Sequence, residues 1–345
     1  MLNNEYDALL VLSFGGPEGN DEVLPFLQNV TRGRGIPDER LVEVGKHYYH
    51  FDGVSPLNEL NREIIANLEV ELQGRGSNLP VYFGNRNWHP FAEETAGQMV
   101  ADGVRNALVF ATSAWAGFSA CLQYNEDIRR IREQHPELRL TKLRQFYDHP
   151  LFIAEMADAV REAYAEVPED RREHTRLLFT AHSVPTDADN RAGGEGDKNL
   201  YSRQVAEASR LIAAEAGVED YDLVWQSRSG NPATPWLEPD VVDLTEAIAA
   251  SDGVRSVVVC PVGFISDHME VVWDLDTELQ EAADDIDVTV HRTRTAGPSQ
   301  RFSTMVADLI AELTDGLPAA GIGDLTIQGC TVNGEACRKG CCSAL

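Results

Sequence analysis

The sequence predicts an α/β architecture in which parallel sheets are divided between two lobes. Short apolar runs alternate with amphipathic segments along almost the whole chain, as in strands that are joined by crossover helices. The runs are continuously apolar, which is typical of strands buried on both faces of a parallel sheet. A length of 345 residues is enough for two lobes with cores of their own, which we place at residues 5–150 and 151–317.

The individual elements follow from these two patterns. Strands are predicted at residues 8–14, 79–84, 106–112, 176–180, 221–226 and 257–260. Helices are predicted at residues 58–72, 152–164 and 202–216, where apolar side chains recur at helical spacing. The remaining segment, residues 318–345, is glycine-rich at its start, and we expect no packed element in it.

The charge balance excludes several classes of function. There are 29 basic and 56 acidic residues, giving a formal net charge of −27. Nucleic acids and anionic membranes both require a basic surface, so we expect neither as a partner. The chain has no apolar run of 18 residues, and its first residues lack a basic segment. We therefore expect no signal peptide, no membrane insertion and a cytoplasmic location.

Several chemically capable residues follow predicted strands, where ligands bind to open parallel sheets. His182 comes directly after one strand and could bind a metal or accept a proton, although a structural histidine would look the same. Glu270, Asp274 and Glu278 recur every four residues and would share one helix face. That face is either solvated or partly enclosed, and in the second case a cation would relieve the repulsion.

Three further features suit an anionic, flat ligand. Arg32 and Arg34 stand among glycines and could bind carboxylates, or they could simply be exposed. Ser55 is predicted to cap the following helix, whose amino end would also favour an anion. Residues 112–124 form a small, polar and aromatic segment after a strand, and the hydroxyl of Tyr124 could reach a polar edge of the ligand.

The cysteines are unevenly placed. Cys330, Cys337, Cys341 and Cys342 crowd the last sixteen residues, which suggests metal ligation rather than disulfides. Three of them with one remote cysteine could hold a 2Fe–2S cluster. Structural zinc on four thiolates and a tail of free thiols are the alternatives. Cys260 is expected to be a core residue of its strand.

Seven segments together resemble the ferrochelatase family. In chain order they are LSFGGP at 12–17, TRGRG at 31–35, GVSPL at 53–57, TAHSVP at 180–185, QSRSG at 226–230, PWLEPD at 235–240 and SDHME at 266–270. They occur in family order and cover roughly residues 5–315, which makes the match specific although each segment alone would be weak.

The resemblance implies a fold and a set of roles. It implies two Rossmann-like lobes with a porphyrin in the cleft between them. His182 and Glu270 match the family's catalytic metal-site pair, and His268 would support the shape of that site. Contacts to the porphyrin propionates fall on Ser55, Tyr124 and Arg32, and the acidic row that lines a metal or proton path falls on Asp274 and Glu278.

Within the family, the chain looks like the soluble Gram-positive branch. That branch inserts Fe(II) into coproporphyrin III, with release of two protons, during haem biosynthesis. The four carboxylates of coproporphyrin suit Arg32 and Arg34, and we see no hydrophobic membrane-binding lip. The alternatives are a protoporphyrin IX ferrochelatase, a non-catalytic tetrapyrrole or iron carrier, and a chelatase for cobalt or nickel. We expect a monomer, and we leave open whether His182 first acts as base or as metal ligand.

Two details concern individual positions. Many soluble relatives carry a tyrosine after the first strand that can ligate the iron, whereas this chain has Phe14, which cannot. Some ferrochelatases hold a 2Fe–2S cluster on a C-terminal extension, with the fourth ligand at the position of Cys121. The resemblance therefore implies the ligands Cys121, Cys330, Cys337 and Cys342, with Cys341 as the alternative for the last place.

Overall fold

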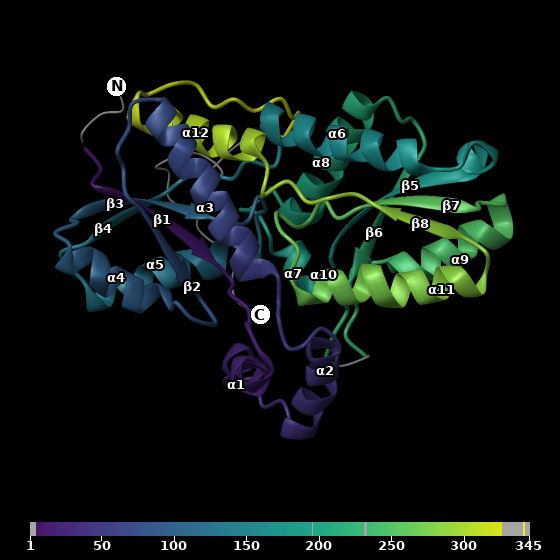
Figure 1. Ribbon diagram of the computed structural model, residues 1–345, viewed down its shortest axis with the longest axis horizontal. Coiled ribbons are helices and arrows are strands. Elements are labelled where there is room, and N and C mark those ends of the chain that lie inside the picture. The colour runs from purple at the N-terminus through teal and green to yellow at the C-terminus, as the bar shows by residue number, and fades with distance from the viewer. Residues whose placement is uncertain (1–4, 195, 231–232, 326–340, 342–345) are drawn as a thin grey trace.

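Two four-stranded parallel sheets form the framework of the protein (Figure 1). The computed structural model describes residues 5–194, 196–230, 233–325 and 341. The strand order is β2-β1-β3-β4 in the first sheet and β6-β5-β7-β8 in the second. In both sheets, the strand that comes second in the chain lies at one edge, followed by the first, third and fourth. The predicted α/β class is confirmed.

The first sheet contains β1 (Ala8–Ser13), β2 (Val81–Asn85), β3 (Asn106–Ala111) and β4 (Arg139–Lys142). Its helices are α1 (Asn20–Val30), α2 (Asp38–His50), α3 (Leu57–Gly74), α4 (Ala92–Ala101) and α5 (Gln123–Gln134), with a π-helical turn, η1 (Phe118–Leu122), before α5.

The second sheet contains β5 (Thr175–His182), β6 (Tyr221–Gln226), β7 (Ser256–Cys260) and β8 (Thr289–Arg292). Its α-helices are α6 (Pro150–Glu166), α7 (Thr186–Asn190), α8 (Leu200–Ala216), α9 (Val241–Asp252), α10 (Met269–Trp273) and α11 (Leu279–Asp285), whereas the last helix, α12 (Gln300–Thr314), lies beside α3 over the first lobe (Figure 1). A 3₁₀ turn, η2 (Glu169–His174), precedes β5, and a π-helical turn, η3 (Asp274–Glu278), joins α10 to α11.

All six predicted strands and all three predicted helices are present, with ends that differ by a few residues. The strands missing from the prediction are β4 and β8, and each lies at one edge of its sheet. Both are four residues long and carry polar side chains, and no residue of β8 is fully buried. They therefore lack the continuous apolar run by which the other strands, including the edge strands β2 and β6, are recognised.

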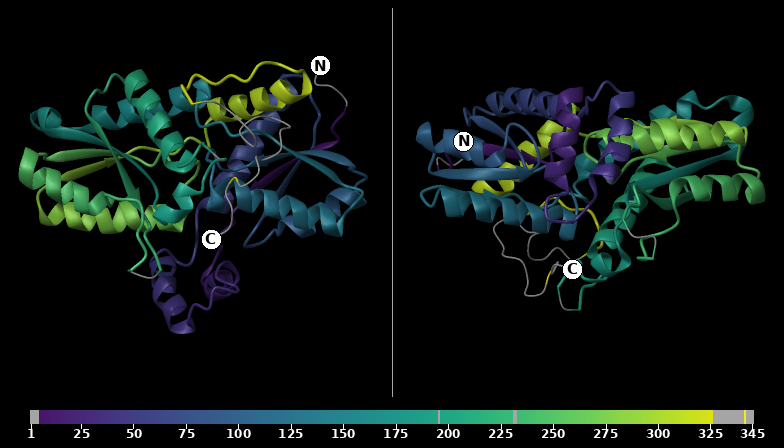
Figure 2. Two further views of the ribbon diagram at one scale, coloured as in Figure 1. Left: turned by 180° about the vertical axis from the view of Figure 1, so that it is seen from behind. Right: turned by 90° about the horizontal axis from the view of Figure 1, so that it is seen from below.

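The junction between the lobes is tightly packed. The segment from Leu143 to His149, which joins β4 to α6, is buried throughout. Helix α12 packs against α3 of the first lobe and α6 of the second (Figure 2). The buried Arg144 reaches α12, where its Nε and Nη2 donate to the two carboxylate oxygens of Glu312 at 2.6 and 2.8 Å. The connection is therefore a structured part of the core.

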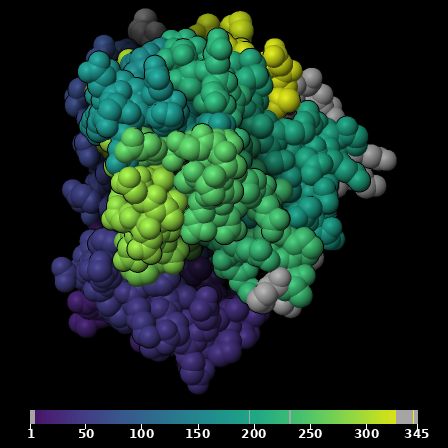
Figure 3. Space-filling view, turned by 90° about the vertical axis from the view of Figure 1, so that its right-hand side faces the viewer, coloured from purple at the N-terminus to yellow at the C-terminus, as the bar shows by residue number. Residues whose placement is uncertain are grey.

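Helices α1 and α2 project from the first sheet and reach the second lobe. The ring of His47 in α2 stacks on Trp273 of α10, with centroids 4.0 Å apart and planes 4° from parallel. Figure 3 shows this projecting segment, in purple, beneath the green surface of the second lobe. The stack gives the lobes a contact at some distance from the buried junction.

The fold leaves the cysteine-rich tail, the cytoplasmic location and the monomeric state untested. Of the predicted tail, only residues 318–325, which are irregular, and Cys341 are described. No helix in the described part of the chain is both long and apolar enough to span a membrane. The cytoplasmic location and the monomeric state stay predictions from the sequence.

We expect Glu312→Gln to destabilise the protein by about 3–5 kcal/mol, because it removes the charge of the carboxylate that binds the buried guanidinium of Arg144 through two hydrogen bonds. Chemical unfolding at pH 7 measures the effect. Glu133→Gln is the matched control, because Glu133 pairs with Arg129 at an exposed position and should matter little. Equal losses in the two variants would contradict the importance of the buried pair.

The same pair should depend on pH in a defined direction. Burial alone would raise the pKa of Glu312, but the hydrogen bond and charge of Arg144 and the amide of Ala320 lower it overall. A carboxyl whose pKa is lower in the folded than in the unfolded state stabilises the fold above its ordinary pKa, and that contribution is lost as the pH falls through the lowered value. The difference between wild type and Glu312→Gln should therefore shrink below about pH 4.

Candidate functional site

A cavity of about 380 Å³ lies where the carboxyl ends of the two sheets face each other. Its walls come from the segments that follow β1, β3, β5 and β7, represented by Phe14, Ser113, His182 and Gly263. In each sheet the strand order reverses between these two strands, β1 and β3 or β5 and β7. Ligands bind to open α/β sheets at such switch points, and here two of them border one cavity.

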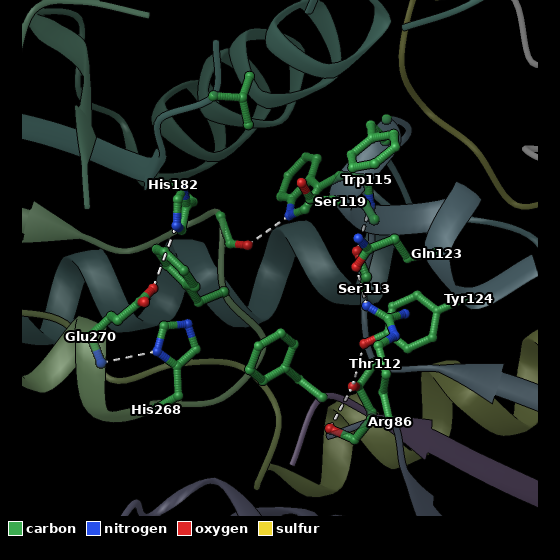
Figure 4. A pocket seen from close by; sticks show the side chains of 18 of the residues that line it. Arg86, Thr112, Ser113, Trp115, Ser119, Gln123, Tyr124, His182, His268 and Glu270 are labelled. Carbon is green, nitrogen blue, oxygen red and sulfur yellow. Dashed lines mark hydrogen bonds and ion pairs between the residues drawn. The ribbon is translucent and has the colours of Figure 1, made fainter. Parts of the chain in front are cut away.

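His182 and Glu270 form a facing pair on one side of the cavity (Figure 4). His182 is the last residue of β5, and its Nε2 lies 3.4 Å from Oε2 of Glu270. Its Nδ1 bonds the carbonyl oxygen of Ser183, which can only accept, so Nδ1 carries a proton. In the neutral ring the Nε2 lone pair then faces a carboxylate. Two acceptors in this arrangement require a cation between them, either a proton or a metal ion.

The electrostatics of the pair favour the charged forms of both groups. Burial would lower the pKa of His182, but the hydrogen bond and charge of Glu270, with the Ser183 carbonyl and Asp274, raise it overall. Burial would raise the pKa of Glu270, but His182, with His268 and His47 nearby, lowers it to about 2. Both shifts therefore favour an imidazolium–carboxylate pair at the border of the cavity.

His268, for which the resemblance implies a role in the shape of the site, holds the start of α10. Its Nδ1 accepts a hydrogen bond from the backbone amide of Glu270 at 3.2 Å, which makes it the N-cap of that helix. Burial lowers the pKa of His268, and the charge of His182 acts in the same direction against Glu270 and Asp267. A neutral ring can accept the amide proton, so His268 fixes the backbone from which the Glu270 side chain extends.

The helix that carries the three acids changes type, and of the three only Glu270 lines the cavity, so the acidic row along a metal or proton path stays a prediction. Helix α10 ends at Trp273, and Asp274 begins the π-helical turn η3. Asp274 is half-buried, whereas Glu278 is exposed. Burial, with the nearby charges of Glu270 and Glu278, raises the pKa of Asp274 to about 7 despite hydrogen bonds from Ser227 and Gln226. Asp274 can therefore exchange a proton near neutral pH.

Ser55 lies in the cavity wall, but the prediction that it caps α3 is wrong. Pro56 occupies the N-cap, and no side chain caps this helix. Ser55 is instead buried against Gly16, where a Cβ atom would lie 2.7 Å from that of Ser55. Its backbone amide donates to the carbonyl of Pro17 at 2.8 Å. The close approach to Gly16 places the serine beside the end of β1.

Tyr124 lies in the wall opposite the His182–Glu270 pair and belongs to a polar network (Figure 4). Its hydroxyl is 3.4 Å from Oγ1 of Thr112, which donates to Oγ of Ser13 at 2.9 Å. The guanidinium of Arg86 lies 4.4 Å from the centre of the tyrosine ring. Burial is the main reason that the pKa of Tyr124 is raised, so the hydroxyl keeps its proton and can donate to an anionic ligand.

Arg86 was missed by the sequence analysis. Its Nε donates to Asp127 at 2.7 Å and its Nη1 to Gln123 at 2.6 Å, so the side chain is fixed against α5. Arg86 directly follows β2 and therefore occupies a strand end, the same position by which His182 was found. That rule, applied to β2, would have identified it.

The two glycine-flanked arginines do not line the same set of cavities. Both are exposed. Arg34 lines the main cavity and an adjoining one of about 660 Å³, whereas Arg32 lines only the second. Arg32 is therefore not brought together with Ser55 and Tyr124 in one cavity, and its contact with a propionate stays a prediction.

The cysteines are only partly described. Cys121 is buried in η1, and Cys260 is buried in β7 as predicted. Cys341 is half-buried and packs against the hydrophobic cluster that contains Cys121, a cluster that extends through both lobes. Cys330, Cys337 and Cys342 lie outside the described residues. Within the described part of the chain, no group of three or more His, Cys, Asp or Glu side chains could by itself hold a metal ion.

Comparisons with solved structures identify the fold. Over 90% of this chain, the fold is similar to that of the sirohydrochlorin chelatase SirB from Bacillus subtilis subspecies spizizenii in complex with cobalt, with a TM-score of 0.51 and 14% identity. The Bacillus subtilis protein SirB with Fe³⁺ gives a TM-score of 0.52 at 15% identity, over 90% of this chain and 97% of that one. At this level of identity, the likeness is one of fold alone.

Comparisons of sequence are more specific. The chain is 57% identical to a coproporphyrin III ferrochelatase of Corynebacterium glutamicum, over 99% of this chain and 93% of that protein. It is 56% identical to the protein of the same name from Nocardia farcinica, over 98% and 96% of the two chains. The family model described as Ferrochelatase matches residues 6–314. The chain therefore belongs to the ferrochelatase family.

Proposed function

We propose that this protein is a coproporphyrin III ferrochelatase, which inserts Fe(II) into coproporphyrin III and releases two protons as a step of haem biosynthesis. The observation that carries the proposal is the His182–Glu270 pair, in which Nε2 and Oε2 lie 3.4 Å apart at the wall of the cavity. The names of the relatives from Corynebacterium and Nocardia support the choice of porphyrin.

The pair suits an exchange between protons and a metal ion. In the resting protein, a proton on His182 satisfies both acceptors, in agreement with the raised pKa of His182 and the lowered pKa of Glu270. Fe(II) can satisfy the same two acceptors once that proton has left, since imidazole and carboxylate are common ligands of divalent metals. Metal insertion must also remove two pyrrole protons, for which a neutral His182 is a suitable base. Whether His182 first acts as base or as ligand stays open.

The other wall of the cavity suits the porphyrin carboxylates. Ser55 and Tyr124 provide neutral hydroxyl donors, and Arg34 and Arg32 provide exposed cations at the main and adjoining cavities. In a chain with a net charge of −27, such cations matter more than in a neutral protein, because a polyanionic substrate must be attracted locally. Coproporphyrin has four carboxylates and protoporphyrin has two, so the cations favour coproporphyrin.

We also propose that a 2Fe–2S cluster is held by Cys121, Cys330, Cys337 and Cys342, with Cys341 as the alternative to Cys342. The donor set suits the cluster, since four thiolates are its usual ligands, but the same set could bind zinc. A buried Cys121 and a half-buried Cys341 on one hydrophobic cluster agree with a tail that returns to the core. When bound, the cluster would supply a one-electron redox centre and a covalent link between tail and lobe.

With Fe(II) in excess, the purified protein should convert coproporphyrin III much faster than protoporphyrin IX. The reason is that protoporphyrin IX has only two carboxylates, so it would leave Arg32 or Arg34 without a carboxylate to bind. Porphyrin absorption measured under anaerobic conditions follows both reactions. Equal rates would refute the preference for coproporphyrin, and tight porphyrin binding without metal insertion would indicate a carrier.

His182→Ala and Glu270→Gln should each lower kcat for iron insertion by roughly a hundredfold or more, because each removes one acceptor of the pair. His174→Ala is the matched control, since His174 is exposed and lies at the amino end of the same strand, β5. Anaerobic turnover and circular dichroism on the three variants separate loss of chemistry from loss of fold. Wild-type turnover in the first two variants would refute the mechanism.

If the cluster is present, anaerobically purified protein should be red-brown and contain about two iron atoms and two sulfides per chain. Cys121→Ser should abolish the visible absorption, whereas Cys260→Ser should retain it, because Cys260 is a core residue of β7. Metal analysis and absorption spectra make the measurement. A colourless protein that contains zinc would establish the zinc alternative instead.

A further inference from the structure

Gln226 occupies a position beside the metal-site pair that no role described above explains. It is the last residue of β6, is 1% exposed, and is the register partner of His182 in β5. Oγ1 of Thr180, a buried residue of β5, donates to Oε1 of Gln226 at 2.5 Å. The amide is therefore oriented with its Nε2 toward Oδ2 of Asp274, at 3.1 Å. An ionised carboxylate can only accept, so this orientation suits the charged form of Asp274.

Ser227 adds a second donor to the same carboxylate. Its Oγ donates to Oδ2 of Asp274, so two consecutive residues at the end of β6 bind one oxygen atom. The backbone of Ser227 has a φ of 62°, in the left-handed region that few residues other than glycine adopt. A non-glycine residue in this conformation persists when surrounding contacts enforce it. The carboxylate of Asp274 is one such contact.

These contacts join the metal-site pair to Gln226 and Asp274 in a closed ring of four residues. Glu270 faces His182, His182 is paired in register with Gln226, and Gln226 binds Asp274. Asp274 follows Glu270 by about one helical turn and completes the ring. Two like charges at this spacing repel each other. Because Gln226 and Ser227 hold the carboxylate of Asp274, the carboxylate of Glu270 is free to turn toward His182.

We propose that Gln226, oriented by Thr180 and assisted by Ser227, is a positioning residue for metal insertion. It holds Asp274 against the end of β6 and thereby sets the rotation of α10 and η3, so that the carboxylate of Glu270 faces Nε2 of His182. This inference rests on the proposed function. Thr180, Gln226 and Ser227 do not line the main cavity, so their loss should impair the metal step and leave porphyrin binding intact.

Thr180→Val and Gln226→Leu test this proposal. Thr180→Val removes the donor that orients the amide with almost no change of volume, and Gln226→Leu removes the amide itself. Each should lower kcat/KM for Fe(II) roughly tenfold, the effect of one lost hydrogen bond. The Kd of coproporphyrin III, measured by fluorescence quenching, should not change. Thr180→Ser keeps the hydroxyl and should restore the wild-type value of kcat/KM.

Thr245→Val is the matched control. Thr245 is buried in the same lobe, and its hydroxyl donates to the carbonyl of Val241 within α9, away from the cavity. This variant should lose some thermal stability but keep its kcat/KM for Fe(II). Wild-type kcat/KM in Thr180→Val and Gln226→Leu would overturn the proposal, as would an equal loss in Thr245→Val or a matching rise in the Kd of coproporphyrin III.

A readout without turnover separates this proposal from the proposed function. The side-chain nitrogen signals of His182, observed by NMR in protein without porphyrin or metal, report on its contact with Glu270. They should shift in Gln226→Leu and Thr180→Val and stay unchanged in Thr245→Val. Unchanged signals in the first two variants would refute the positioning role. A wild-type protein that inserts no iron would refute the proposed function alone.

Discussion

The close approach of the Gly263 turn to the end of β5 determines where the site forms. The amide of Gly263 donates to the carbonyl of Thr180 at 3.0 Å, and a Cβ atom at Gly263 would lie 2.5 Å from that of Ala181. From the first lobe, Nε1 of Trp115 donates to the carbonyl of Gly263 at 2.8 Å. The segment from β7 to α10 is thus held between a strand of its own lobe and a side chain of the other. These contacts fix the start of the segment that carries His268 and Glu270 to the side of the cavity where His182 lies.

Local charge, rather than net charge, governs the two substrates that the site is proposed to bring together. The acids that face the cavity attract a divalent cation but repel a porphyrin with four carboxylates. Interactions between exposed charges decay over about 8 Å at physiological ionic strength, so the overall charge of −27 acts weakly over longer distances. Cations at the first lobe and acids at the second can therefore coexist around one cavity. Arg86, which is held in place by its ion pair with Asp127, adds a positive group to the wall of the first lobe, and a positive group does not attract a metal ion.

Much of this arrangement could be predicted from the sequence, and the remainder could not for physical reasons. Continuous apolar runs identified the central strands, and the rule that ligands bind at strand ends identified His182. The distance between His182 and Glu270 depends on the Gly263 turn and on strand register, which no local pattern encodes. The π-helical turn at Asp274 could not be predicted either, because the acids keep the same four-residue spacing in the sequence whether the helix is of the α or the π type. Ser55 looked like a helix cap because its neighbour Gly16, which draws it toward β1, is distant in the sequence.

The two lobes contribute different kinds of residue to the cavity, and this division bears on how the site could move. His182, Glu270, Asp274 and Gln226 all belong to the second lobe and are joined by contacts within it. Ser55, Tyr124 and Arg86 all belong to the first lobe. A small rotation between the lobes would change the gap available to a flat ligand without separating His182 from Glu270. Two contacts join the lobes beside the site: the stack of His47 on Trp273, which directly precedes Asp274, and the hydrogen bond from Trp115 to Gly263. Such a rotation would strain these two contacts. The contacts that hold His182 opposite Glu270 therefore lie within one lobe, so the geometry of this pair would be kept if the distance between the lobes changed.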